Sequence, residues 1–268
     1  MMWNAGSSPP SSTPTRRLRM TVFKLETRKL THSTVARTAS IAAVALVVLT
    51  SIGGYAASQL DPASPLAAKA AFLVRAPGWP GYVGLAAMSV GVVMLLATGI
   101  LVAWSFGREF TDGTVVGLFA LPPSPLTTAC AKTAALLAWV VAMSSVCSLL
   151  AAAGGIALGL PASGLWSALA SVWTVAVLLG ISALPVGWVA TVGRGYLAGI
   201  TAALGIVVVA NLAAGFGVGA WIPWAAPVLW ATPGEDLHPV SLAAPLLMGL
   251  LGGALTLNAW RVLELGNR

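Results

Sequence analysis

Residues 82–104, YVGLAAMSVGVVMLLATGILVAW, form an apolar stretch without a charged side chain. An α-helix rises ~1.5 Å per residue and the hydrocarbon core of a bilayer is ~30 Å thick, so roughly 20 such residues cross it. Five further stretches share this length and lack of charge: 39–57, 133–158, 165–190, 197–220 and 240–260. The sequence therefore predicts an all-α integral membrane protein with six transmembrane helices.

The composition supports the same fold class. Hydrophobic residues make up 58% of the chain and charged residues only 8%, whereas soluble domains carry about 25% charged residues. The net charge of +7 does not indicate nucleic-acid binding, because half of the basic residues lie in the first 37 positions, beside a predicted span. Membrane lipid is the expected surrounding. About forty residues precede the first span, more than the basic leader of a signal peptide, so we expect this span to be retained.

The distribution of Lys and Arg predicts the orientation. If the N-terminus is cytoplasmic, twelve of the fourteen basic residues lie in cytoplasmic segments and only Lys69 and Arg75 lie outside. This is the asymmetry of the positive-inside rule. Six spans then return the C-terminus to the cytoplasm. Tryptophans near the predicted span ends, such as Trp79 outside and Trp260 inside, are typical of the membrane interface. We expect a multi-pass protein of the inner (plasma) membrane.

The N-terminal region precedes the first span. Residues 1–15 are rich in Ser, Pro and Thr and predict a disordered tail. In residues 16–38, Leu18, Val22, Leu25 and Lys29 fall on one helical stripe, which favours an amphipathic helix on the cytoplasmic interface. A basic tail that only sets the topology is the alternative. Residues 39–268 then form the transmembrane domain.

Small residues recur at a spacing that lets membrane helices approach closely. These glycines are Gly195, Gly199, Gly215, Gly219, Gly249 and Gly253. Because such pairs occur in many helix bundles, they predict packing and no particular function. Pro185 predicts a kink in the fourth span, where the carbonyl that it frees needs another partner. Cys130 and Cys147 are interpreted as packing residues.

The loop between the second and third spans is the longest predicted cytoplasmic loop. Arg108 and Glu109 are expected to continue the second helix beyond the membrane surface. Asp112-Gly113 is a strong turn signal, and Thr114 is suited to cap a following helix.

That following helix is short and apolar, with the body Val115, Val116, Leu118 and Phe119. Pro122 and Pro123 end it, and Ser124-Pro125 starts the third span as an N-cap and first helical residue. Its apolar side chains require either lipid or a groove on another protein.

This loop resembles the signature of ABC-2-type transporter permeases. The resemblance rests on Arg108-Glu109-Phe110, Asp112-Gly113-Thr114, Leu118, Ala120-Leu121-Pro122 and Ala131-Lys132. In that family Ser-Arg usually follows the proline, whereas this chain has Ser124-Pro125. Residues 23–30, six spans and the Pro- and Trp-rich segment before the last span also fit, so the resemblance covers most of residues 20–265.

The resemblance implies a permease that pairs as a homodimer or heterodimer and docks a separate ABC ATP-binding subunit. It also implies that the loop after the second span is the coupling helix. The residues carried over to this role are Arg108, Glu109, Phe110, Asp112, Gly113, Thr114 and Leu118. Glu109 is the strongest single candidate, and the alternative for it is an Arg–Glu pair that only holds the loop.

The sequence lacks the residues that several kinds of functional site require. A phosphate-binding P-loop requires a Gly-Lys pair, which the chain does not contain, so ATP and Mg²⁺ are expected on the partner subunit. No cluster of acid, base, metal ligand or nucleophile predicts an enzyme or a cofactor. Glu235, Asp236 and His238 are a weak metal signal, and we expect no metal. Spans without ionisable residues also disfavour an ion-coupled secondary transporter.

The expected function is therefore that of the permease subunit of an ABC exporter. Its uncharged spans suit an amphipathic or apolar cargo, such as a drug, antibiotic, peptide or lipid-like molecule. A non-transporting membrane scaffold or assembly protein is the alternative, although it gives no reason for the loop between the second and third spans. The sequence does not identify the cargo, the ATPase, the pairing of permeases or, except by resemblance, the transport direction.

Overall fold

The computed structural model describes residues 13–61, 63–118, 123–235 and 237–263. These residues form helices and connecting turns, with no strand among them. Six helical segments are long and apolar enough to cross a membrane, so the predicted number of spans is confirmed. They are Thr34–Ser58, Gly78–Thr111, Pro125–Ala157, Ala162–Val192, Tyr196–Gly215 and Pro239–Arg261. Most of the predicted N-terminal tail lies outside the described residues.

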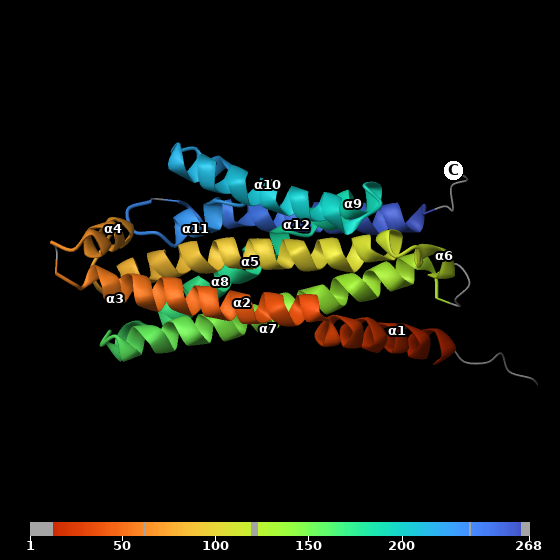
Figure 1. Cartoon of the computed structure of the whole chain (residues 1–268), viewed down its shortest axis with the longest axis horizontal. Coiled ribbons are helices and arrows are strands. Elements are labelled where there is room, and N and C mark those ends of the chain that lie inside the picture. Colours follow the sequence, from red (N-terminus) through yellow and green to blue (C-terminus); the bar gives the residue numbers. More distant parts are fainter. Residues whose placement is uncertain (1–12, 62, 119–122, 236, 264–268) are drawn as a thin grey trace, which may run out of the picture.

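Helical labels follow Figure 1. The first half of the chain contains α1 (Thr13–His32), α2 (Thr34–Val48), η1 (Leu49–Gly53), α3 (Gly54–Ser58), α4 (Pro65–Leu73), α5 (Gly78–Thr111), α6 (Val115–Leu118) and α7 (Pro125–Ala157). The second half contains η2 (Ala162–Gly164), α8 (Leu165–Ser182), α9 (Pro185–Val192), α10 (Tyr196–Gly215), η3 (Gly219–Trp221), α11 (Ala226–Trp230), η4 (Pro239–Leu242) and α12 (Ala243–Arg261).

Helix α5 is the centre of the bundle. It packs against α2, α7, α8, α9 and α10, and Figure 1 shows it running between α2 and α10. Its buried face includes small residues such as Ala86, Ala87 and Ala103, which allow neighbouring backbones to come close. α5 also extends beyond its apolar core to Thr111 and carries Arg108 and Glu109 with it, as predicted.

At Pro185, where the sequence predicts a kink, the fourth span is divided into two helices. α8 ends at Ser182 and α9 begins at Pro185, which has no backbone N–H to continue the ladder. The indole Nε1 of Trp224 donates a hydrogen bond to the carbonyl oxygen of Ser182 at 3.0 Å. A side chain from the loop before the sixth span therefore satisfies a carbonyl at this break.

The first span contains a π-helical turn. α2 is continued by η1, a π-helix over Leu49–Gly53, and then by α3. Such turns are rare and frequently occur at functional sites. No sequence pattern predicted this turn.

Helices α1 and α6 lie at one end of the bundle, and α4 and α11 lie at the other (Figure 1). The last turn of α12 is at the same end as α1, as an even number of spans requires. We call these the α1 end and the α4 end. In the predicted orientation, the α1 end is cytoplasmic.

Helix α1 packs one face against the bundle. Val22, Glu26 and Leu30 are buried against α7. Leu18 and Leu25 of the predicted stripe have 41% and 52% of their surface exposed. The ion pairs of Glu26 inside the bundle fix the rotation of the helix, and the placement of the stripe on the membrane interface stays a prediction.

The six glycines of the packing prediction differ in their surroundings. A Cβ atom added to Gly199 would lie 2.6 Å from Ala103, and one added to Gly249 would lie 2.5 Å from Ile181, so both are close helix contacts. Gly219 is similarly crowded by its neighbours, whereas Gly195 and Gly253 have ordinary contacts. Nothing lies within 4 Å of the same position at Gly215.

Candidate functional site

The predicted turn after the second span is present. Asp112 ends α5, and its N–H donates to the carbonyl of Arg108 at 2.8 Å. Gly113 has a φ of 68°, a left-handed conformation that glycine adopts without strain. Nothing lies within 4 Å of a Cβ position at Gly113, so backbone conformation rather than space selects glycine here.

The chain then forms α6 over Val115–Leu118. We call residues 108–118 the coupling segment, after the role that the sequence resemblance predicts for this loop. Asp112, Gly113, Thr114 and Gly117 are exposed, and Val116 has 59% of its surface exposed. Leu118 is the last residue of α6. The predicted remainder of this helix and its proline stop fall at residues 119–122, outside the described residues, while Pro123 follows them.

Glu109 is at the base of the coupling segment and is buried. Its Oε1 lies 2.8 Å from Nζ of Lys132 on α7, and the same ammonium group lies 3.0 Å from Oε2 of Glu26 on α1. We call these three residues the triad. Their side chains are between 2% and 7% exposed. The triad therefore joins α1, α5 and α7 where the second span enters the coupling segment.

Two further groups complete the network around the triad. Nζ of Lys29 lies 2.6 Å from Oε1 of Glu26, so each carboxylate oxygen of Glu26 has its own ammonium partner. The hydroxyl of Thr114 lies 3.4 Å from both the backbone oxygen and Oε2 of Glu109. The two lysines balance the charge of the two glutamates, and Thr114 connects the exposed turn to the buried carboxylate.

The electrostatics of the triad follow from burial and pairing. Burial raises the pKa of Glu26, but the charges of Lys132 and Lys29 and their hydrogen bonds outweigh it, so the pKa lies below the ordinary value of 4.5. Removal of one partner from a buried ion pair typically costs about 3–5 kcal/mol, because the remaining charge is left without compensation. The triad consequently connects the three helices through buried ion pairs whose partners depend on one another.

Arg108 and Phe110 point to other partners. The guanidinium carbon of Arg108 lies 4.7 Å from the centre of the Trp104 ring, a cation–π arrangement. The ion-pair partner of Glu109 is thus Lys132 rather than Arg108. The ring of Phe110 meets that of Trp260 edge to face at 6.2 Å.

Trp260 and Trp79, two of the tryptophans near predicted span ends, contact other parts of the protein. Trp260 is fully buried and donates from Nε1 to the hydroxyl of Thr191 at 3.0 Å. Trp79 is also buried and donates to the carbonyl of Pro161 at 2.7 Å. Both side chains therefore make contacts within the helix bundle.

Sequence reasoning missed the role of Glu26 and used Lys132 only as part of a motif. One signal for Glu26 was available, since it is the single acidic residue of α1 among several basic ones. The position of Lys132 depends on the start of α7, where the hydroxyl of Ser124 accepts from the N–H of Thr127 at 3.2 Å. The predicted N-cap at Ser124 is therefore confirmed.

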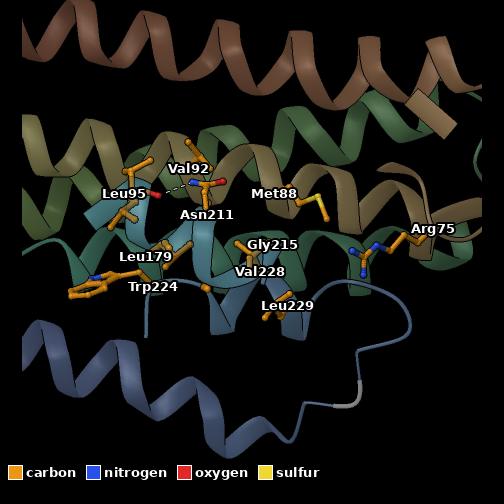
Figure 2. A pocket seen from close by; sticks show the side chains of 15 residues that line it. Arg75, Met88, Val92, Leu95, Leu179, Asn211, Gly215, Trp224, Val228 and Leu229 are labelled. Atoms are coloured by element: carbon orange, nitrogen blue, oxygen red, sulfur yellow. Dashed lines mark hydrogen bonds between the residues drawn. The ribbon is translucent and has the colours of Figure 1, made fainter. Parts of the chain in front are cut away.

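A second feature is a cavity of about 250 Å³ between α5, α8, α10 and α11, shown in Figure 2. Its lining is mostly apolar and consists of Arg75, Met88, Gly91, Val92, Leu95, Leu179, Val207, Ala210, Asn211, Ala214, Gly215, Trp224, Ala225, Val228 and Leu229. Mostly apolar pockets with a few polar groups are typical of small-molecule sites.

Two polar side chains line this cavity. Nδ2 of Asn211 donates to the carbonyl of Val207 in its own helix at 2.8 Å, so its amide is held in place with the oxygen still able to accept (Figure 2). Arg75 comes from the segment before α5 and pairs with Glu235 at 2.8 Å. The cavity thus offers one neutral polar group at α10 and one paired cation nearer the α4 end.

Two of the three residues that gave the weak metal signal, Glu235 and His238, have other partners in the structure. Glu235 pairs with Arg75, and Nδ1 of His238 accepts from the N–H of Val240 at 3.3 Å. Asp236 lies outside the described residues. Among the residues that the structure describes, no three His, Cys, Asp or Glu side chains are grouped to hold a metal ion.

Comparison with protein families gives one match. The family described as ABC-2 family transporter protein matches residues 22–210. The matched region contains Glu26, the coupling segment and Lys132, and it extends to Ala210 on α10 at the cavity. Comparison with curated proteins gives no match.

Proposed function

The chain belongs to the ABC-2 transporter family as a multi-pass transmembrane permease, and on this premise we propose that it is the permease subunit of an exporter. The proposed exporter moves an amphipathic or apolar cargo across the inner (plasma) membrane. ATP is hydrolysed by a separate ABC ATP-binding subunit, because the chain has no Gly-Lys pair for a P-loop. The chain itself binds no cofactor and catalyses no reaction in this proposal.

One observation carries the proposed coupling role. The coupling segment has an exposed tip, including Asp112 and Val116, on a buried base at Glu109. In this proposal, the exposed apolar side chain of Val116 contacts a groove on the ATP-binding subunit rather than lipid. A partner that presses on this tip would act on α1, α5 and α7 together, since the triad connects the three helices.

The cavity supports the proposed cargo class. Apart from Arg75 and Asn211, its lining carries no charged or amide side chain, and Arg75 is already paired with Glu235. A charged cargo would lose its hydration in this cavity without gaining an ion-pair partner, which is unfavourable. An amphipathic cargo instead gains apolar contacts and can donate a hydrogen bond to the neutral amide oxygen of Asn211.

We also propose that two permeases form the transport unit, as identical or related copies. A single bundle of six helices offers a cavity of only about 250 Å³ at α10. Gly215, which lines this cavity, has nothing within 4 Å of a Cβ position, so a neighbouring chain has room to approach there. The test is the mass of the purified complex in nanodiscs.

The main test changes the coupling tip without touching the triad. Val116→Asp places a charge on the exposed apolar surface of α6. Val240→Asp is the matched control, because Val240 is 71% exposed and belongs to η4, which precedes α12. We expect a nucleotide-binding subunit to co-purify with wild type and with Val240→Asp, and to be lost, or to lose cargo-stimulated ATPase activity, with Val116→Asp.

Other outcomes would count against the proposal. Recovery of no ATPase with wild type after crosslinking in gentle detergent would favour the scaffold function. Equal loss of the ATPase with both variants would show that the α6 surface has no specific role. Folding of each variant is checked by the elution profile of the purified protein.

A further inference from the structure

A second hollow lies at the α4 end of the bundle. It is a groove of about 760 Å³ between the first span, the short helix α4 and the central helix α5. Its lining is apolar except for Lys69 and two hydroxyl side chains. Leu46, Leu49 and Leu66 line it and are 47%, 69% and 59% exposed, so the groove is open at the side of the bundle.

The backbone of the first span creates this space. The π-helical turn η1 supplies Leu49 and Gly53 to the lining, and α3 follows with further small residues. A Cβ atom on Gly53 would meet only Leu49, at 3.9 Å, so the groove is empty beside this glycine. A π-turn next to an apolar hollow is an unusual local structure, and such turns are frequent at functional sites.

Lys69 is the charged group at the edge of the groove. It belongs to α4, is exposed and lines the groove. None of the ion pairs found among the described residues includes Lys69, whereas Arg75, the other basic residue of the same loop, is paired with Glu235. The groove therefore combines long apolar walls with one cation that has no anionic partner in the described part of the chain.

We propose that this groove binds an anionic phospholipid, with an acyl chain along the first span and α5 and the headgroup phosphate at Lys69. The inference uses the proposed orientation, in which the α4 end is the outer surface. Apolar walls alone would accept any acyl chain. Lys69 gives the preference for a headgroup with a net negative charge. A basic side chain near the membrane surface favours binding of an anionic lipid over a neutral lipid by about five-fold.

This site is separate from the cargo cavity but adjacent to it. Met88 and Val92 of α5 line both hollows. A bound acyl chain would support these two side chains from the groove side. The lipid is consequently expected to affect the shape of the cavity wall and not to compete directly with cargo.

The test uses the full permease in nanodiscs that contain equal amounts of phosphatidylglycerol and phosphatidylcholine. Each lipid is added in turn as a trace photoreactive analogue, and labelled peptides are identified by mass spectrometry. We expect labelling of the first span and α4 by phosphatidylglycerol to exceed that by phosphatidylcholine about five-fold. Lys69→Gln should abolish this preference and leave acyl labelling at the phosphatidylcholine level.

Two further variants separate the groove from general effects. Gly53→Leu fills the groove and should reduce labelling by both lipids. Gly205→Leu is its control, because nothing lies within 4 Å of a Cβ on Gly205 and that residue lines neither hollow. Arg75→Gln removes the paired cation of the same loop and should leave the preference at Lys69 unchanged.

Equal labelling by the two lipids in wild type, or an unchanged preference in Lys69→Gln, would overturn the proposal. Efficient crosslinking between two copies of the chain through a cysteine at Leu66 would also overturn it, because the occupant would then be protein. The readout does not depend on ATP. Loss of lipid labelling with intact ATPase coupling, or the reverse, therefore distinguishes failure of this proposal from failure of the proposed function.

Discussion

Lys132 and Glu109 meet 2.8 Å apart across the contact between α7 and α5, and both side chains are nearly inaccessible to solvent. This ion pair fixes the end of the second span to the start of the third. Because Glu26 of α1 shares the same ammonium group, the coupling segment has a base formed by three helices. The predictions below begin with this base.

Lys132→Met should destabilise the protein by about 3–5 kcal/mol, because two buried carboxylates would lose their common partner. Thermal unfolding of the purified permease in detergent measures the change. Lys24→Met, at an exposed position on α1, is the control and should have little effect. Combining Lys132→Met with Glu26→Gln and Glu109→Gln should recover part of the loss, and no recovery would argue against charge as its cause.

The triad also predicts a pH dependence. The pKa of Glu26 is lower in the folded protein than its ordinary value of 4.5, so ionised Glu26 stabilises the folded state. This contribution is complete above pH 4.5 and is lost as the pH falls through the lowered pKa. We expect unfolding temperatures to fall over that acidic range in wild type. Glu26→Gln should show a smaller fall, and an identical profile would disprove the assignment.

Asn211→Leu should weaken the response to cargo that offers a hydrogen-bond donor. A neutral hydrogen bond contributes about 0.5–1.5 kcal/mol, which corresponds to an increase of up to about ten-fold in the cargo concentration for half-maximal ATPase stimulation. Basal ATPase activity should not change. Val208→Leu, at a 55% exposed position on the same helix, serves as the control. Equal effects of the two variants would place the cargo elsewhere.

Trp224→Phe should reduce stability by about 1–3 kcal/mol, because the carbonyl of Ser182 would lose its hydrogen-bond partner at the helix break. Trp221→Phe provides the comparison, since Trp221 is 87% exposed. Unfolding temperatures of both variants measure the difference. A larger loss with Trp221→Phe would contradict the role assigned to Trp224.

Much of the fold follows from short-range features of the sequence. Apolar length predicts the six spans, Pro185 predicts the break in the fourth, and Asp112-Gly113 predicts the turn of the coupling segment. Each of these depends on residues close together in the chain. The extension of α5 beyond its apolar core through Arg108 and Glu109 is also predicted from neighbouring residues.

The remaining features depend on contacts between distant segments. Hydrophobic spacing alone does not show that Glu26 of α1 is buried, because its partner Lys132 lies on α7, 106 positions along the chain. Trp260 is a tryptophan near the end of a span, which predicts an interface residue from sequence alone. In the structure its side chain contacts Thr191 and Phe110 within the helix bundle. The π-helical turn at Leu49–Gly53 and the groove beside it have no comparable pattern in the sequence.

The separation of Glu26 from Lys132 has a consequence for synthesis of the chain. The two residues are 106 positions apart, so at roughly 5–20 residues per second the ribosome makes Lys132 about 5–20 seconds after Glu26. During that interval two spans are inserted while α1 has no partner on α7. The final packing of α1 must therefore follow synthesis of Lys132, and chains stalled before Lys132 should expose α1 to added protease.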